Sequence, residues 1–233
     1  MVFSPDDLVV LGTPVYAGRV PNVLLKFLQT MQGDGAIGVP VVLYGNRNFD
    51  DALVELRDLM EKAGMRTIAA AAFIGEHSFS RVLAAGRPDQ ADRVKMDEFS
   101  ALVAGKLAES LLPDGGVADF HHPVSVEGTP FPYRGYYTPR DRHGNGIDIR
   151  KVKSLVNAKC TDCKVCADVC PMGSISRDDV REYTGICIKC GACIKKCPEG
   201  ARYYVDEGYL YHQHELEAMY GERRAEPVFF LQA

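Results

Sequence analysis

The chain has 233 residues, of which 46% are hydrophobic and 25% charged, a composition that excludes disordered and fibrous proteins. The formal net charge of −4 argues against a nucleic-acid partner. No apolar run approaches the roughly 18 residues of a membrane span, and the first residues lack the basic flank and apolar stretch of a signal peptide. We therefore expect a cytoplasmic protein that binds neither membranes nor nucleic acid.

The N-terminal part alternates apolar runs typical of buried strands with stretches of helical periodicity. Strands are predicted at residues 7–12, 39–45 and 67–74. Pro21 and Gly33 suit the start and the end of a first helix, and Asn48 or Asp50 suits the cap of a second that ends at Gly64. A third helix opens at Pro88 and Asp89, and its expected apolar face is Phe99, Val103, Leu107 and Leu111. This alternation predicts a parallel sheet with helices on both faces.

The pattern breaks after residue 112, where prolines and glycines become frequent. A structureless connection of this length is unusual inside one domain, so it indicates a boundary. The expected organisation is an α/β domain at 1–112, a wrapping segment at 113–158, a cysteine domain at 159–206 and a C-terminal helix and tail at 207–233. Within the last part we expect a short helix at 215–220 and an apolar tail, 227–231, that docks onto the protein.

All eight cysteines lie between residues 160 and 197, in two copies of one motif. Each copy has the spacing Cys-x2-Cys-x2-Cys-x3-Cys-Pro, and the second is displaced by 27 residues at every cysteine. In a reducing compartment such clustering indicates metal rather than disulfides. In this motif three thiolates hold one cluster, and the fourth cysteine ligates the other cluster. We therefore expect two 4Fe-4S clusters, one held by Cys160, Cys163, Cys166 and Cys197, the other by Cys187, Cys190, Cys193 and Cys170.

Zinc is the alternative metal for these cysteines. The pair Cys163 and Cys166 and the pair Cys187 and Cys190 are separated by 20 residues, as in a zinc ribbon. That interpretation leaves four cysteines and both Cys-Pro pairs unexplained. The repeat therefore favours iron–sulfur clusters.

Residues 159–205 resemble a bacterial-type dicluster ferredoxin. The resemblance implies two antiparallel hairpins and short helices folded around the clusters. Lys189, Lys195 and Lys196 lie near the second motif. They form either a solvated face or a docking site for an acidic redox partner.

Two loops, 12–21 and 44–51, each follow a predicted strand, where α/β sheets bind ligands. With segments 73–78 and 86–89, they resemble the flavodoxin-like domains fused to dicluster ferredoxins in many anaerobes. The resemblance implies a partial flavodoxin-like sheet that binds FMN through aromatic stacking and backbone hydrogen bonds. The candidate FMN-binding residues are Thr13, Tyr16, Tyr44, Gly45, Asn46 and Phe49.

The chain departs from the flavodoxin pattern at its start. Its first predicted strand matches the third strand of that family, so the first two strands, the first helix and the phosphate loop have no counterpart. We expect a truncated start or a variant that has lost strong FMN binding. The remaining three-stranded sheet would leave an unpaired edge, which an oligomer could cover.

These features predict an iron–sulfur electron-transfer protein, of oxidoreductase type, that relays electrons between two clusters and FMN and acts with redox protein partners. The alternative is a flavin-free ferredoxin whose α/β domain is a docking module for a larger redox complex. A regulatory role is disfavoured, because the sequence has no helix-turn-helix signal and no basic recognition helix. The sequence does not identify the electron donor, the acceptor or the cluster potentials.

Overall fold

The computed structural model describes residues 1–110 and 122–232, and these form two compact units. Unit 1 comprises residues 1–76, 86–137 and 223–233, whereas unit 2 comprises residues 77–85 and 138–222. Among the described residues, the expected wrapping segment contributes 122–137 to unit 1 and 138–158 to unit 2. No helix in the described ranges is both long and apolar enough to cross a membrane.

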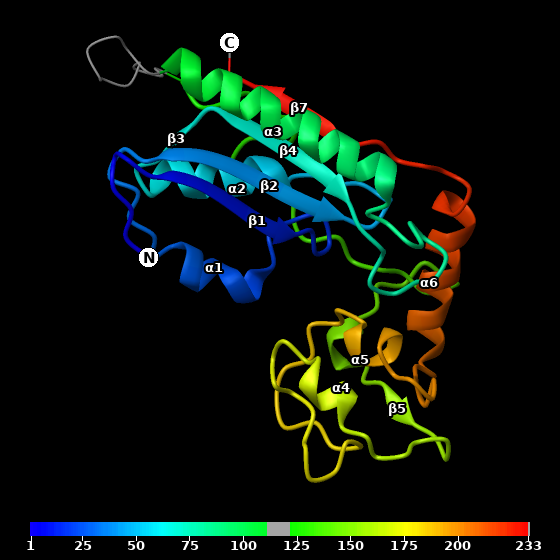
Figure 1. Cartoon of the computed structure of the whole chain (residues 1–233). Helices are drawn as coiled ribbons and strands as arrows, with labels where there is room; N and C mark the ends of the chain where they lie inside the picture. Colours follow the sequence, from blue (N-terminus) through cyan, green and yellow to red (C-terminus); the bar gives the residue numbers. More distant parts are fainter. Residues whose placement is uncertain (111–121, 233) are drawn as a thin grey trace. The chain divides into compact units, whose positions relative to one another are not determined.

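Unit 1 is built on a mostly parallel sheet, as predicted (Figure 1). Strands β1 (Leu8–Pro14), β2 (Ile37–Tyr44) and β4 (Ala69–Ile74) run parallel in the order β1-β2-β4, and the short β3 (Arg66–Thr67) also pairs with β2. All six residues of β4 are buried, which explains their continuous apolar run. Because the three main strands are parallel, their carboxyl ends lie side by side at the same end of the sheet, which we call its carboxyl edge.

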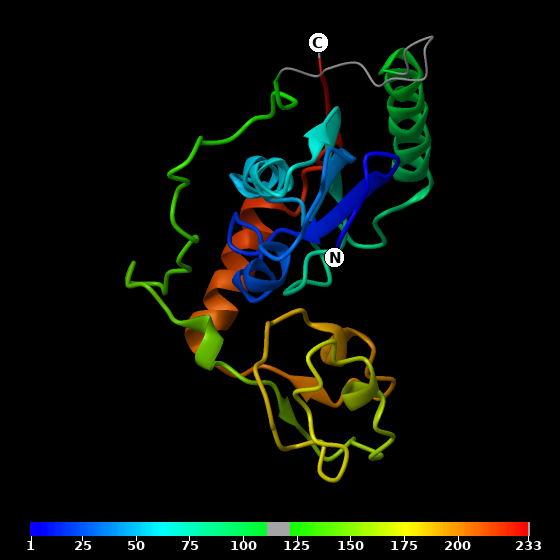
Figure 2. The ribbon, with the colours of Figure 1, turned by 90° about the vertical axis from the view of Figure 1, so that its left-hand side faces the viewer.

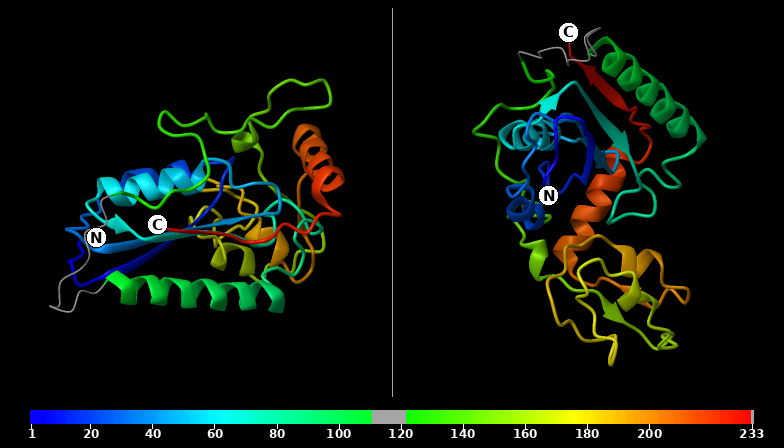
Figure 3. Two further views of the ribbon diagram at one scale, coloured as in Figure 1. Left: turned by 90° about the horizontal axis from the view of Figure 1, so that it is seen from above. Right: turned by 60° about the vertical axis from the view of Figure 1, so that its left-hand side comes forward.

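Helices cover both faces of this sheet (Figure 2). Helices α1 (Asn22–Leu28) and α2 (Ala52–Lys62) lie on one face, and α3 (Gln90–Ser110) lies on the other (Figure 3). Helix α2 buries Leu53, Leu56 and Met60, whereas α3 buries Phe99 and Val103 in a core with β2 and β4. The predicted α/β layering is therefore confirmed. Leu111, the last residue of the apolar face expected for α3, lies outside the described residues.

Two helix boundaries differ from the prediction. Helix α1 ends at Leu28 rather than near Gly33. Asp51, rather than Asn48 or Asp50, is the N-cap residue of α2, and its side chain makes no cap hydrogen bond. Its carboxylate instead accepts hydrogen bonds from the segment 122–137, including one from the Thr129 backbone N–H at 2.9 Å. The helix-capping propensity of one residue could not indicate that Asp51 bonds to Thr129, which is far away in sequence.

The apolar tail forms a strand, β7 (Val228–Leu231), that pairs antiparallel with β4. The ring centroid of Phe229 lies 5.7 Å from that of Phe73 and 5.1 Å from that of Phe99. Strand β7 thus covers the sheet edge that β4 would otherwise expose. Among the described strands, β1 pairs with β2 alone and forms the other edge, with Leu8 and Val10 exposed.

Replacing Phe229 by alanine is expected to destabilise unit 1 by about 2 kcal/mol, because a half-buried aromatic contact to Phe73 and Phe99 is lost. Faster amide hydrogen exchange in β4 and β7 would measure the effect. Phe27→Ala is the matched control, because Phe27 is exposed on α1 and its loss should change stability by no more than ~0.5 kcal/mol. Equal exchange in the two variants would contradict the docking of β7.

Unit 2 contains short elements around the cysteines. Strand β5 (Leu155–Val156) pairs antiparallel with β6 (Arg202–Tyr203), and an isolated antiparallel bridge joins Ile175 to Tyr183. Three short helical turns, η1 (Ile149–Lys151), α4 (Val165–Asp168) and α5 (Ala192–Lys195), precede the longer α6 (Glu207–Tyr220). Helix α6 begins eight residues before the predicted 215–220, because Asp206 caps it by accepting a hydrogen bond from the Tyr209 N–H at 2.8 Å.

Candidate metal centre

The two cysteine motifs repeat in backbone conformation as well as in sequence. Helices α4 and α5 have four residues each, and both begin after a left-handed residue, Lys164 with φ of 63° and Gly191 with φ of 71°. Gly173 and Gly200, which follow the two Cys-Pro pairs, have φ of 56° and 57°. The members of each pair are 27 residues apart. The internal repeat is therefore structural, and each copy presents its cysteines from the same kind of loop and helical turn.

Four cysteines line one cavity of unit 2, and they come from both motifs. Cys160, Cys163 and Cys166 of the first motif line it together with Cys197 of the second. These sulfurs do not converge on a point: in the described ranges, no group of three or more His, Cys, Asp or Glu side chains is placed to hold a single metal ion. The grouping of Cys197 with the first motif is the one expected of a dicluster ferredoxin.

The other four cysteines are Cys187, Cys190 and Cys193 of the second motif and Cys170 of the first. Cys187 and Cys190 both interact electrostatically with Cys193, and burial raises the pKa of the Cys193 thiol. Cys170 is linked to them through Ser174, whose backbone N–H donates to the Cys170 sulfur at 3.3 Å. The Ser174 hydroxyl donates in turn to the carbonyl of Ile186, the residue before Cys187.

Ala201 makes the equivalent of the Ser174 bond in the second copy, because its backbone N–H donates to the Cys197 sulfur at 3.3 Å. Such bonds stabilise thiolate ligands and tune cluster potentials. None of the eight cysteines forms a disulfide, and cysteine thiolates are the ligands that iron–sulfur clusters require. The donor set, its grouping around a cavity and the two N–H···S bonds fit iron–sulfur clusters.

Arg202 is a buried cation beside the cysteine-lined cavity. The spacing of the cysteines did not single it out. Its side chain lines the cavity, and the residue is 3% exposed. Burial lowers the pKa of Arg202, but the Cys166 sulfur, with Tyr183 and Cys193, outweighs burial and raises that pKa above its usual value. A comparison of the two copies would have revealed Arg202, because Ile175 occupies the equivalent position in the first copy.

Of the three lysines near the second motif, Lys189 and Lys195 are bonded within unit 2, whereas Lys196 is exposed. The Lys189 ammonium donates to the carbonyls of Arg150 and Cys187 at 3.1 and 3.2 Å. The Lys195 ammonium donates to the carbonyl of His77 at 2.7 Å. The expectation of a solvated or docking face is therefore wrong for Lys189, which is buried, and Lys195 has an internal partner.

The expected FMN residues lie at the carboxyl edge of the sheet in unit 1. Tyr44 and Phe49 are buried, and their rings pack against each other with centroids 5.7 Å apart. Thr13 is buried at the end of β1 and its hydroxyl has no hydrogen-bond partner among the described atoms. Tyr16 and Gly45 are half-buried in the loops after β1 and β2.

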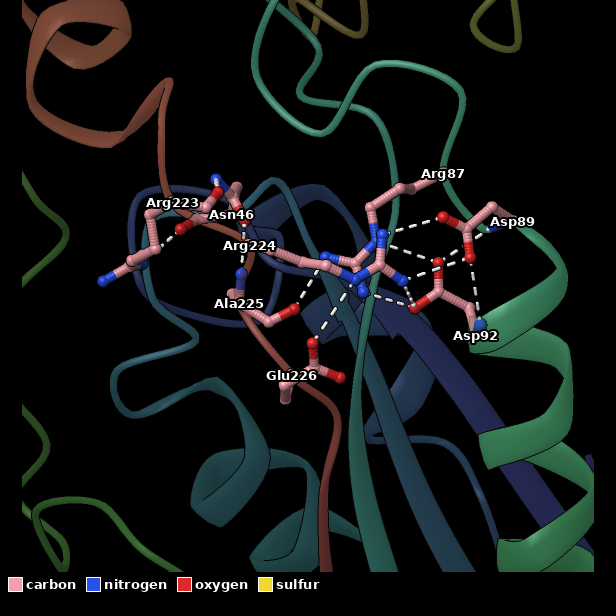
Figure 4. A network of polar contacts seen from close by, with 8 residues as sticks. All are labelled: Asn46, Arg87, Asp89, Asp92, Arg223, Arg224, Ala225 and Glu226. Atoms are coloured by element: carbon pink, nitrogen blue, oxygen red, sulfur yellow. Dashed lines mark hydrogen bonds and ion pairs between the residues drawn. The ribbon is translucent and has the colours of Figure 1, made fainter.

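Asn46, the sixth candidate, is 1% exposed and is occupied by the C-terminal segment (Figure 4). Its amide nitrogen donates to the Arg223 carbonyl at 2.6 Å, and its amide oxygen accepts from the Ala225 N–H at 3.0 Å. The Arg223 guanidinium donates to the backbone carbonyls of Asn46 and Arg47. The side chain and the backbone carbonyl of Asn46 are thus already engaged, so Asn46 does not fit an FMN ring edge in this arrangement.

A network of charges fastens the C-terminal segment to the loop before α3 (Figure 4). Arg87 pairs with Asp92, with Nε to Oδ2 at 2.8 Å, and donates to the Ala225 carbonyl at 2.6 Å. Arg224 pairs with Asp89 at 2.7 Å. Because the contacts made by Ala225 and Arg224 join residues more than 130 positions apart, no local sequence pattern signals them.

Comparison with known proteins identifies the class of unit 2. Residues 159–202 match the family described as the 4Fe-4S dicluster domain, so an iron–sulfur domain of this class is present in the chain. A subunit I of an NAD(P)H-quinone oxidoreductase from Gloeobacter violaceus is 32% identical over 109 residues. The match covers 40% of this chain and 47% of that relative, so the chain spans less than half of the relative's length. A search of solved structures gave no match.

Proposed function

We propose that the chain is an electron-transfer protein that carries two 4Fe-4S clusters. Cys160, Cys163, Cys166 and Cys197 would hold the first cluster, and Cys170, Cys187, Cys190 and Cys193 the second. The observation that carries the proposal is the cavity lined by three cysteines of one motif and the fourth of the other. Each cluster would exchange one electron with redox partner proteins in a reducing compartment, which we take to be the cytoplasm.

The partners follow from the comparison and the chemistry. The relative is a subunit of an NAD(P)H-quinone oxidoreductase, and we propose that this chain likewise acts together with other redox proteins. In this proposal all eight cysteines of the chain are cluster ligands, so none is left to act as a nucleophile. We therefore propose an electron carrier or a subunit of a redox complex rather than an enzyme with its own small-molecule substrate.

Unit 1 would act as a docking module without flavin. The observation behind this choice over an FMN relay is the occupation of Asn46 by Arg223 and Ala225. The burial of Tyr44 and Phe49 supports it, because both rings already pack inside unit 1. Binding of FMN there would need the C-terminal segment to leave the carboxyl edge of the sheet.

Protein purified without oxygen is expected to contain about eight irons, about eight sulfides and no flavin per chain. Dithionite should bleach its visible absorbance, because reduction changes the charge-transfer bands between sulfur and iron. Iron, sulfide and flavin assays on one sample test the cluster content and the absence of flavin separately. A protein with stoichiometric FMN would refute the flavin-free docking module alone, whereas a protein that holds zinc or no iron would refute the electron-transfer function.

A further inference from the structure

The internal repeat is broken at one buried position beside the cysteines. Ile175 follows Gly173 by two residues and is 4% exposed, and 27 residues later Arg202 follows Gly200 by two residues and is 3% exposed. The same backbone position thus carries an apolar side chain in one copy and a permanent positive charge in the other. A buried apolar residue needs no partner, whereas a buried guanidinium does.

The surroundings of Arg202 supply hydrogen bonds, and the groups there that can carry negative charge are the sulfurs of Cys166 and Cys193 and the Tyr183 hydroxyl. Nη1 donates to the Ser154 hydroxyl at 2.9 Å and to the Tyr183 hydroxyl at 3.2 Å, and Nη2 donates to the Val180 carbonyl. Nε is buried without a hydrogen-bond partner among the described atoms. Within residues 1–110 and 122–232, no carboxylate forms an ion pair with Arg202. A buried guanidinium without an anionic partner is strongly unfavourable, so Arg202 requires an anion formed at these sulfurs.

The cavity supplies this anion. Arg202 lines the cavity of Cys160, Cys163, Cys166 and Cys197, the site of the first cluster. We infer that Arg202 is the counter-charge of this cluster, with its free Nε–H donated to a cluster sulfur. The inference rests on the proposed function, because it requires a cluster in that cavity.

A counter-charge of this kind acts on the redox equilibrium. A cluster gains one electron, and hence one negative charge, when it is reduced. The fixed charge of Arg202 therefore favours the reduced form and raises the reduction potential of the first cluster. The second site has its own buried cation, Lys189, which donates to two carbonyls and does not line the cavity of the first cluster.

The test is an EPR-monitored redox titration of the intact chain with Arg202→Gln and Arg202→Lys. Arg181→Gln is the matched control, because Arg181 is an exposed arginine of the same unit, 3.6 Å from Asp179. Cys163→Ala identifies the signal of the first cluster, which it should remove. We expect Arg202→Gln to lower the potential of the first cluster and to shift the second much less.

We expect Arg202→Lys to keep the first potential close to that of the wild type, because the charge stays, and Arg181→Gln to change neither potential. Equal shifts of both clusters, or none, in Arg202→Gln would overturn the inference. If that variant loses its iron, Arg202→Lys decides: a shift confined to the second cluster would overturn the inference. Wild-type protein without iron would instead refute the proposed function, so the two failures are distinguishable.

Discussion

Replacing Cys197 by alanine is expected to remove the first cluster and leave the second, although Cys197 belongs to the second motif. The reason is its place in the cavity beside Cys160, Cys163 and Cys166. Alanine offers no thiolate, so one iron of the first cluster loses its protein ligand. The iron content should fall from about eight toward about four per chain. Anaerobic iron analysis and EPR of the dithionite-reduced protein measure this outcome.

The EPR spectrum of the cluster that remains in each variant shows which cysteines hold the same cluster. Cys197→Ala should leave the same EPR spectrum as Cys163→Ala, because both variants lose a ligand of the first cluster. Cys170→Ala should match Cys190→Ala, because both lose a ligand of the second. A Cys197→Ala spectrum that matches Cys190→Ala would show that each motif holds its own cluster, and the crossed ligation would be wrong.

The sequence predicted the parts of the fold that depend on local patterns. The run of buried residues in β4 and the four-residue spacing of Phe99 and Val103 depend on periodicity, so their elements were found close to their true bounds. The cysteine repeat was equally readable, because cluster ligation requires fixed spacing. In both cases one short stretch of chain contains all the information.

What the sequence did not reveal depends on contacts between distant segments. Strand β7 appeared only as an apolar tail, because its partner β4 lies about 160 positions earlier in the chain. Asp51 is an ordinary cap residue by type, yet its carboxylate accepts hydrogen bonds from the backbone of Thr129 and Arg134. Partner choice of this kind is a property of the packed structure.

The candidate FMN residues show the same limit at a functional site. Thr13 and Tyr44 lie in the last residues of β1 and β2 and the other candidates follow these strands, because parallel strands gather such residues at one end of the sheet. The sequence could not indicate that Arg223 and Ala225 bond to Asn46 at that edge. The chain's own C-terminal segment therefore competes with any ligand for the polar groups of Asn46.

Replacing Arg87 by methionine is expected to destabilise unit 1 by about 3 kcal/mol, because Asp92 would keep its charge in a buried place without its main partner. The side chains of Arg87 and Asp92 are 4% and 1% exposed. Arg224 remains 3.6 Å from Asp92 and offsets part of the loss. The bond from Arg87 to the Ala225 carbonyl is lost as well, so the segment before β7 should loosen.

Hydrogen exchange followed by mass spectrometry should locate this loss in β4 and β7, with unit 2 unchanged. Lys95→Met is the matched control: it removes an exposed ion pair to Glu98 on α3, worth at most ~0.5 kcal/mol.

The pH dependence of unfolding gives a second check. Arg87 holds the pKa of Asp92 below its usual value, so the pair stabilises the fold above the usual carboxyl pKa and stabilises it less as acid protonates Asp92. The Arg87→Met variant should lose this part of the acid sensitivity. A variant that is as stable and as acid-sensitive as the wild type would show that the pair does not fasten the C-terminal segment.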